Sequence, residues 1–361
     1  MFGNAVRRES AGHRVNVVSL REEREMKNSM KLMLAVACGA LVMAGATQAQ
    51  VREQTFWWTT ANPAGHPIPV GGQKFADLVA AKSGGKMQVK VFPGGVLGGD
   101  VQVLSAVQGG TIDMASMNSG ILQGQIKEYA IVDFPFLFDN AKEADAILDG
   151  PIGKQLADKL PEKNLVHLAY YDLGFRNLTD SRRAVKTADD IAGLKIRVIQ
   201  SPIYVDTFNA LGANAVPMAF TEVYTALEQK AIDGQENPYT VIEANKFQEV
   251  QKYLAGTHHM YNPQSMFVSK KTWDRLNKDE QQIVLDAAKE SAVYQRKFSR
   301  DAQDSALANL KKTMEYTELP PAEIAKIRTK LKPVIDKYSN NVGADFAKQV
   351  FAEVDKVRAA K

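Results

Sequence analysis

The sequence predicts an α/β protein, because strand-like and helix-like segments alternate along most of the chain. Residues 54–60 and 87–92 alternate as strands do, and Phe75, Leu78 and Val79 between them form the apolar stripe of a helix. The 361 residues are too many for one ordinary hydrophobic core. We therefore expect helix-covered sheets, arranged as two domains or as one large α/β unit.

The alternation continues beyond this first part of the chain. Further strands are expected at residues 112–117, 165–171, 195–198 and 265–269, and further helices near residues 101–107, 205–211 and 221–229. The sequence shows no internal repeat and no low-complexity tract, so the α/β pattern accounts for most of its length.

The C-terminal third is predicted to be almost wholly helical. Asn277 and Glu280 form the pattern of a capping box, and residues 278–314 contain no Pro or Gly. One uninterrupted helix there would be about 55 Å long, enough to brace two lobes. Two shorter helices joined at a bend are the alternative. Two further amphipathic helices are expected near residues 322–338 and 343–357.

The N-terminal region has the pattern of a secretory signal. Lys27 and Lys31 precede an apolar run over residues 32–46, and small residues follow as far as Ala49. We expect cleavage after Ala49 rather than a retained anchor, because the apolar run is too short for a comfortable membrane span. Residues 1–25 are either an artefact of start-site choice or a true extension.

The only cysteine, Cys38, lies inside this predicted signal. A lipid anchor is disfavoured, because a lipoprotein signal needs an aliphatic residue three positions earlier and Ala35 stands there. Cleavage would leave no thiol, which excludes disulfides, cysteine nucleophiles and thiolate metal sites. It would also remove seven Lys and Arg and four Asp and Glu, which lowers the net charge from +4 to +1. This near-neutral charge gives no support to nucleic-acid binding.

Arg197 lies in an apolar segment, which predicts a positive charge close to the core. Leu194, Ile196 and Val198 alternate around it as in a short strand. A guanidinium in such a place needs an anionic partner. Because no acidic residue is close in sequence, the partner is either a distant Asp or Glu or a bound anion.

A second arginine and an asparagine also follow predicted strands. Arg176 comes after the strand at 165–171, and its neighbours at 173–175 favour a partly buried position. Two arginines at strand ends suggest an anion site in a cleft between lobes. A guanidinium binds a carboxylate with two parallel hydrogen bonds, so organic acids are the expected ligands. Asn237 adds an amide that both donates and accepts.

Several segments around these residues resemble the solute-binding proteins of tripartite ATP-independent periplasmic (TRAP) transporters, the DctP-like family. The segments are GLKIRV, PMAFTEVYTALEQKAIDGQENP, FQEVQKYL, VFPGGVLGG, VQGGTIDMA, DFPFLF and TADDIAGLK. The resemblance covers nearly the whole chain after the predicted signal.

The resemblance implies a fold and its boundaries. Family members have a two-lobed periplasmic binding protein fold, type II-like, with long hinge-crossing helices, and close on the ligand. Residues 1–49 would be the N-terminal extension and signal peptide. Residues 50–173 and 263–301 would form lobe I, and residues 174–262 and 302–361 would form lobe II.

The resemblance also implies roles for residues. Arg197 matches the arginine that forms the paired contact with the ligand carboxylate. Phe220 matches the aromatic residue that packs beside the ligand, and Asn237 matches the asparagine that hydrogen-bonds it. Arg176 matches an earlier arginine of the family, in a run of sequence that varies among members.

Four other residues are candidates for the ligand pocket, and the first lobe is expected to decide which acid binds. Asn62 and His66 follow the first predicted strand, and Asn118 follows the strand at 112–117. Tyr239 either lines the pocket or packs against the hinge.

The function implied by the resemblance is that of a periplasmic receptor. It would bind a small organic acid, such as a dicarboxylate, and deliver it to the membrane subunits of a TRAP transporter. We expect a monomer that binds no cofactor, no metal ion and no nucleic acid.

Two other function classes were weighed. An enzyme is disfavoured, because no G-x-S-x-G, H-E-x-x-H or P-loop pattern occurs. The side chains of the adjacent His258 and His259 should diverge, so they would not chelate one metal. Glu222 and Glu236 could be a catalytic carboxylate pair, but Glu222 opens a predicted helix, where a negative charge is favoured in any case. An ABC-type receptor for another small solute is the remaining alternative.

Overall fold

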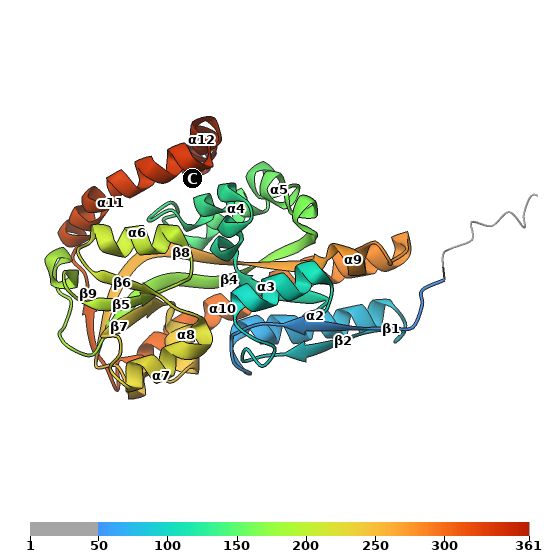
Figure 1. Cartoon of the computed structure of the whole chain (residues 1–361), viewed down its shortest axis with the longest axis horizontal. Helices are drawn as coiled ribbons and strands as arrows, with labels where there is room; N and C mark the ends of the chain where they lie inside the picture. Colours follow the sequence, from blue (N-terminus) through green and yellow to red (C-terminus); the bar gives the residue numbers. More distant parts are fainter. Residues whose placement is uncertain (1–49, 361) are drawn as a thin grey trace, which may run out of the picture. The chain divides into compact units, whose positions relative to one another are not determined.

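A mixed β-sheet runs through the part of the chain that the computed structural model describes, residues 50–360 (Figure 1). In the order of the sheet, the strands are β2 (Met87–Phe92), β1 (Gln54–Thr59), β3 (Met114–Asn118), β8 (Tyr253–Ser269), β4 (Leu165–Asp180), β7 (Gly234–Asn237), β5 (Lys195–Val198) and β6 (Asn214–Pro217), and β9 (Glu315–Glu318) pairs with β8. The predicted signal peptide, residues 1–49, lies outside the described residues.

The α-helices are α2 (Pro67–Lys82), α3 (Asp100–Gly109), α4 (Ala141–Leu148), α5 (Pro151–Ala157), α6 (Pro202–Ala210), α7 (Val223–Glu228), α8 (Tyr239–Ala244), α9 (Lys270–Trp273), α10 (Lys278–Leu310), α11 (Pro321–Val342) and α12 (Ala344–Ala359). Short 3-10 helices are η1 (Ser119–Gly124), η2 (Lys127–Asp133), η3 (Leu160–Lys163), η4 (Ala188–Ile191), η5 (Phe220–Glu222) and η6 (Phe247–Glu249). Between residues 50 and 360, no helix is both long enough and apolar enough to cross a membrane.

Two long antiparallel strands, β4 and β8, connect the two halves of the sheet. β8 pairs with β3 through Met114–Asn118 at one end, and β4 pairs with β7 through Asn237 and its neighbours at the other. Their own ladder has a register shift between Asp172 and Gly174. The lobe boundaries predicted at 173/174 and 262/263 meet at this point, because Gly174 pairs with Asn262. The predicted strands at 165–171 and 265–269 are therefore parts of longer strands.

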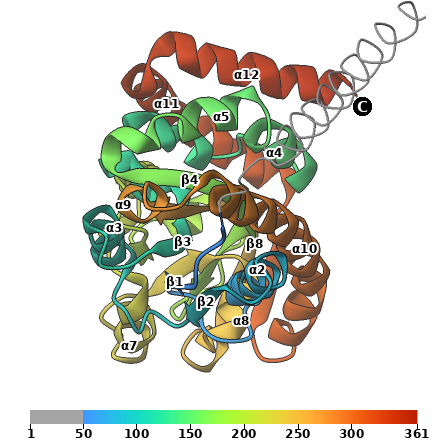
Figure 2. The ribbon, with the colours of Figure 1, turned by 90° about the vertical axis from the view of Figure 1, so that its right-hand side faces the viewer.

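On each side of these long strands, parallel strands alternate with helices. β1 pairs in parallel with β2 and β3, with α2 and α3 in the connections. β5 pairs in parallel with β6 and β7, with α6 and α7 in the connections. Figure 2 shows α11 and α12 lying over α4 and α5, where the C-terminal helices cover the chain between β3 and β4.

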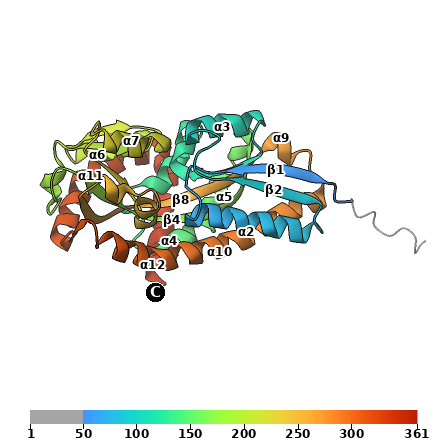
Figure 3. The ribbon, with the colours of Figure 1, turned by 90° about the horizontal axis from the view of Figure 1, so that it is seen from below.

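A single long helix, α10, packs against both halves, as Figure 3 shows from below. It has 33 residues, which corresponds to about 50 Å, and it contacts α2, β4 and α8. The predicted capping box is confirmed, because the Asn277 side chain accepts from the Glu280 amide at 3.0 Å and Glu280 Oε2 accepts from the Asn277 amide at 2.9 Å. The helix ends at Leu310 rather than at Met314, because a turn follows.

The packing of α10 on α2 and β4 depends on a glycine and a glutamine. A Cβ atom at Gly71 would lie 2.5 Å from Gln295 Cγ, so only glycine permits this approach. Gln295 accepts from the Asp172 amide at 2.8 Å and donates to the Asp172 carbonyl at 2.7 Å. The long helix is thereby fixed to β4 at the register shift between the two halves.

Candidate ligand-binding site

The predicted site residues converge on one narrow cavity at the ends of β3, β5 and β7. Its lining consists of Ala61, Asn62, Asp100, Asn118, Leu173, Arg176, Arg197, Ile199, Phe220, Asn237, Val241, Asn262 and Gln264. Six of the eight residues predicted from the sequence are among them, and His66 and Tyr239 are not. About 30 Å³ of the cavity is open to the centre of a water molecule, and about 10–15 Å³ of such volume holds one water.

Arg197, at the end of β5, presents an unpaired N–H group to this cavity. Its side chain is buried, and Nε and Nη2 donate to the Met218 carbonyl at 3.0 and 2.7 Å. Nη1 is buried and has no partner among the described residues, and no described acid forms an ion pair with Arg197. The guanidinium lies 5.7 Å from the Phe220 ring. Burial lowers the pKa of Arg197 to about 10, so the group is charged at neutral pH.

Arg176, by contrast, has its partner within the chain. It forms an ion pair with Glu236, in which Nη2 lies 2.8 Å from Oε1, and Nη1 donates to Asn262 Oδ1 at 2.8 Å. Glu236 also accepts from His259 Nε2 at 3.2 Å. Two arginines at one anion site are expected from the sequence, but Glu236 neutralises Arg176, and Arg197 is the lining arginine that forms no ion pair with a described acid.

Burial alone would raise the pKa of Glu236, but Arg176 and His259 outweigh burial and hold the pKa below its usual value. The carboxylate is therefore charged, and it fixes the arginine in place. Arg176 and Glu236 are 60 residues apart in the sequence. The β4–β7 ladder, in which Leu178 pairs with Glu236, brings their side chains together. Sequence spacing gives no signal for this contact.

The amide of Asn237 has a fixed direction, set by a chain of hydrogen bonds behind it. Gln251 Nε2 donates to main-chain carbonyls, so Gln251 Oε1 accepts from Thr179 Oγ1 at 2.8 Å. Thr179 Oγ1 in turn accepts from Gln235 Nε2 at 2.9 Å, and Gln235 Oε1 accepts from Asn237 Nδ2 at 2.5 Å. The Asn237 oxygen is therefore left free to accept, and one of the two amide N–H groups is used within the chain.

Asn118 is oriented in the same manner. Tyr204 donates its hydroxyl proton to Asp133 Oδ1 at 3.1 Å, so its oxygen accepts from Asn118 Nδ2 at 3.4 Å and from Asn262 Nδ2 at 3.1 Å. The Oδ1 atom of Asn118 is buried without a donor, and so is Oε1 of Gln264. Asn62 uses its amide nitrogen on Thr60 Oγ1 at 3.2 Å.

Sequence reasoning missed Asp100 and Gln264, which line the same cavity as Arg197. Asp100 is the first residue of α3. Burial raises the pKa of its carboxyl to about 6, against the opposing effect of Arg197. An acidic residue in a first helical turn is common, so the pattern of the sequence did not mark it. Gln264 lies within β8, where nothing in the sequence distinguishes it from its neighbours.

A glycine-rich lip, the segment Gly94–Gly99, precedes Asp100 at the edge of the cavity. A Cβ atom at Gly95 would lie 2.5 Å from Thr221 Cγ2, and one at Gly99 would lie 3.4 Å from Ala219 Cβ. The lip thus touches both neighbours of Phe220 on the opposite wall. These contacts join the lip to the wall that carries Phe220.

His66 and Tyr239 have other roles in the structure. His66 caps α2, because Nδ1 accepts from the Ile68 amide at 3.2 Å, and burial lowers the pKa of His66 to about 3. The Tyr239 hydroxyl lies 3.4 Å from both His258 Nε2 and Tyr316 Oη. Tyr239 therefore packs against other residues instead of lining the pocket. Neither side chain lines the cavity.

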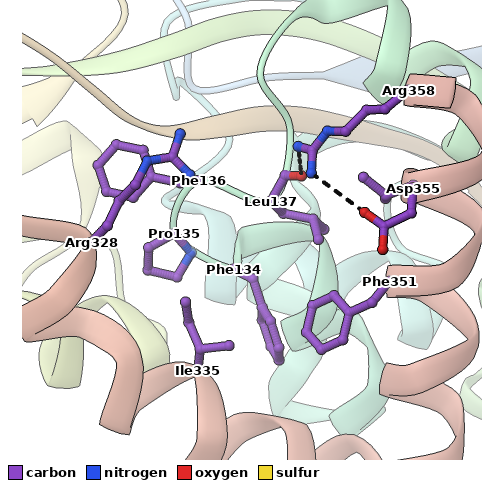
Figure 4. Close-up of a pocket in the computed structure, with 10 residues that line it drawn as sticks. Phe134, Pro135, Phe136, Leu137, Arg328, Ile335, Phe351, Asp355 and Arg358 are labelled. Carbon is purple, nitrogen blue, oxygen red and sulfur yellow. Dashed lines mark hydrogen bonds and ion pairs between the residues drawn. The ribbon is translucent and has the colours of Figure 1, made fainter. Parts of the chain in front are cut away.

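A larger cavity, of about 220 Å³, lies elsewhere, between the loop after η2 and helices α11 and α12 (Figure 4). Its floor is apolar, and Arg358 at its edge is bound to the Leu137 carbonyl and paired with Asp355. None of its lining residues has a buried polar atom without a partner. The smaller cavity is therefore the better candidate site. Among residues 50–360, no cluster of His, Cys, Asp and Glu that could hold a metal ion occurs.

The two halves joined by long strands, the hinge-crossing α10 and the polar cavity between them define a type II periplasmic binding fold. The family model for bacterial extracellular solute-binding proteins, family 7 (DctP), matches residues 59–341. The chain belongs to this family of periplasmic TRAP solute-binding proteins, which are receptors and not enzymes.

Similar proteins and structures agree with this assignment. The chain is 40% identical to the 2,3-diketo-L-gulonate-binding periplasmic protein YiaO of Escherichia coli, over 67% of this chain and 74% of that protein. A TRAP periplasmic solute-binding protein from Ochrobactrum anthropi, solved with its C-terminus bound in the ligand-binding pocket, is 52% identical, with a TM-score of 0.77 and coverage of 86% and 98%. The sugar acid binding protein DctPAm from Advenella mimigardefordensis, in complex with galactonate, is 39% identical, with a TM-score of 0.83 and coverage of 85% and 99%.

Proposed function

We propose that this chain captures a small organic acid in the narrow cavity and delivers it to the membrane subunits of a TRAP transporter. The observation that carries the proposal is the buried Nη1 atom of Arg197, a charged donor without a partner in the described chain. A buried unpaired charge is costly, and a ligand carboxylate would remove the cost.

The geometry around Arg197 suits a carboxylate. Met218 holds the guanidinium from the Nε side, which leaves the edge formed by Nη1 and Nη2 toward the cavity. This edge carries two parallel N–H groups, the arrangement that binds both oxygens of a carboxylate. Phe220 covers the face of the guanidinium and Asn237 lies beside it, so these three residues are proposed as the carboxylate subsite.

The ligand is proposed to drive closure of the two lobes, because both predicted lobes contribute residues to the cavity. Asn62, Asp100 and Asn118 belong to the predicted lobe I, and Arg197 and Asn237 belong to the predicted lobe II. A ligand that contacts both sets stabilises the closed arrangement over an open one by its additional contacts. Because the free volume is only about 30 Å³, entry and release require the walls to separate. The closed form is the one proposed to be recognised by the membrane subunits.

The test is the substitution Arg197→Lys, measured by calorimetry with the best acid from a thermal-shift screen. Loss of the bidentate contact should weaken binding by about 100-fold, from about 1.5–3 kcal/mol per charged hydrogen bond. The matched control is Arg183→Lys, since Arg183 also donates to main-chain carbonyls, at Asp190 and Ala192, but lies outside the cavity. Unchanged affinity in Arg197→Lys would contradict the proposal. Stabilisation by neutral sugars or amino acids and by no acid would favour the ABC-type alternative.

A further inference from the structure

We infer that this site selects acids with one carboxylate and several hydroxyl groups, of the aldonate type, over dicarboxylates. The inference deepens the proposed function and rests on it. It assigns Asp100, Asn118 and Gln264 as hydroxyl acceptors, a role that the sequence motifs do not suggest for Asp100 or Gln264.

The unpaired charge and the free acceptors around the cavity differ in place. Arg197 supplies the cationic side chain there that forms no ion pair with a described acid, because Arg176 is paired with Glu236. Asn62, Asn118 and Asn237 each use one amide N–H group, on Thr60, Tyr204 and Gln235, and Asn262 uses two, on Asp133 and Tyr204. Asn118 Oδ1 and Gln264 Oε1 are left as buried acceptors without a donor among the described residues, and Asp100 adds a carboxyl.

The amides of Asn237 and Asn118 cannot turn to exchange their oxygens for nitrogens. The Asn237 amide is fixed by the chain that runs through Gln235 and Thr179 to main-chain carbonyls behind Gln251. The Asn118 amide is fixed by Tyr204, whose proton goes to Asp133. The oxygens of Asn118 and Asn237 are therefore available to accept hydrogen bonds from a ligand.

The charges around the cavity also favour a ligand with a single carboxylate. One ligand carboxylate neutralises Arg197, and no second free cation lines the cavity within the described chain. A second carboxylate would instead face the acceptor oxygens of Asn118 and Gln264 and the carboxyl of Asp100. Like charges and unpaired acceptors in a buried site are strongly unfavourable. Hydroxyl groups donate to the same oxygens, and a hydroxyl bound to a carboxylate forms a charge-assisted hydrogen bond.

The experiment compares four acids of one chain length that separate charge from hydroxylation. D-galactonate has one carboxylate and five hydroxyls, galactarate has a second carboxylate in place of the terminal CH2OH group, and hexanoate and adipate are the corresponding acids without hydroxyls. The four-carbon set of D-erythronate, meso-tartrate, butyrate and succinate repeats the comparison for a shorter ligand. Calorimetry on the mature protein gives each affinity.

The expected result is that galactonate or erythronate binds at least 100-fold more tightly than the dicarboxylate of the same length. In Asp100→Asn, affinity for the hydroxylated monocarboxylate should fall by about 10-fold, whereas affinity for the dicarboxylate should stay the same or rise. Asp77→Asn on the exposed face of α2 is the matched control and should change neither affinity.

Tighter binding of succinate or adipate than of the hydroxylated monocarboxylates would overturn the inference, and so would an equal loss for all acids in Asp100→Asn. If dicarboxylates are preferred and Arg197→Lys still abolishes their binding, only the inference fails and the proposed function stands. If no acid of either set, or of any other chain length, binds, the proposed function fails as well.

Discussion

The two walls of the cavity differ in how their side chains are held. On the wall formed by β4, β5 and β7, Arg176 and Asn237 are almost fully buried and are fixed by hydrogen bonds within the chain. On the opposite wall, Asp100 begins a helix, is only partly buried and follows the glycine-rich lip. The first wall is arranged before any ligand arrives. The second wall carries Asp100, Asn118 and Gln264, which are proposed above as hydroxyl acceptors.

The largest expected effect is on the prearranged wall. Glu236→Ala leaves Arg176 buried and unpaired, which should lower the free energy of unfolding by about 3–5 kcal/mol. Urea unfolding monitored by circular dichroism measures the change. The double variant Arg176→Met/Glu236→Leu removes both charges and should recover most of the loss. If Glu236→Ala unfolds at the wild-type urea midpoint, the wall is not held by this ion pair.

The next prediction concerns the lip. Gly94 and Gly95 have φ values of +76° and +69°, so alanine at either position costs about 1–2 kcal/mol of stability. Only Gly95→Ala also places a Cβ against Thr221 Cγ2 in the closed form, since nothing lies within 4 Å of a Cβ at Gly94. Ligand affinity should therefore fall at least about 10-fold in Gly95→Ala and little in Gly94→Ala.

Calorimetry on the Gly94→Ala and Gly95→Ala variants measures this difference. Thr221→Ser removes Cγ2 and keeps the hydroxyl, so the double variant Gly95→Ala/Thr221→Ser should regain most of the affinity. Equal losses in the two glycine variants would show that the lip contact does not contribute to closure.

A smaller effect is expected from pH. The pKa of Asp100 is raised to about 6 by burial, so the carboxylate takes up a proton as the pH falls from 7 to 5 and becomes a weaker acceptor. Affinity for a hydroxylated acid should fall several-fold over this range, and Asp100→Asn should flatten the dependence. The buried Asp133, whose pKa burial raises to about 7, titrates nearby, so Asp133→Asn is the required control. A wild-type slope that survives in Asp100→Asn would assign the dependence to another group.

The smallest effects are expected at the two predicted residues that lie outside the cavity. His66→Ala removes the cap of α2 and should cost about 1 kcal/mol of stability, whereas His66→Asn retains an acceptor and should cost less. Ligand affinity should change less than about twofold in either variant, and in Tyr239→Phe. A large loss of affinity without loss of stability would restore these residues to the site.

Local pattern was sufficient for much of the fold and for part of the site. The capping residues of α10 and the absence of Pro and Gly predicted one long helix, and the structure confirms it. In β1, Trp58 is buried whereas Trp57 is 43% exposed, as the alternation of side chains along a strand requires. The apolar neighbours of Arg197 predicted its burial. These properties depend on residues close in sequence, where spacing determines direction.

Other properties depended on contacts between distant segments. Glu236 became the partner of Arg176 through the register of β4 and β7, and hydrogen bonds that run through Thr179 of β4 fix the orientation of the Asn237 amide.

The sequence by itself determined an α/β chain of a receptor family, with a buried arginine that needs an anion. Only the tertiary structure decided which arginine lacks an ion pair, that Asp100 and Gln264 line its cavity, and that His66 and Tyr239 do not. The reason is physical: a periodic pattern fixes which face of an element is buried, but the partner of a buried polar group depends on which elements pack together and in what register.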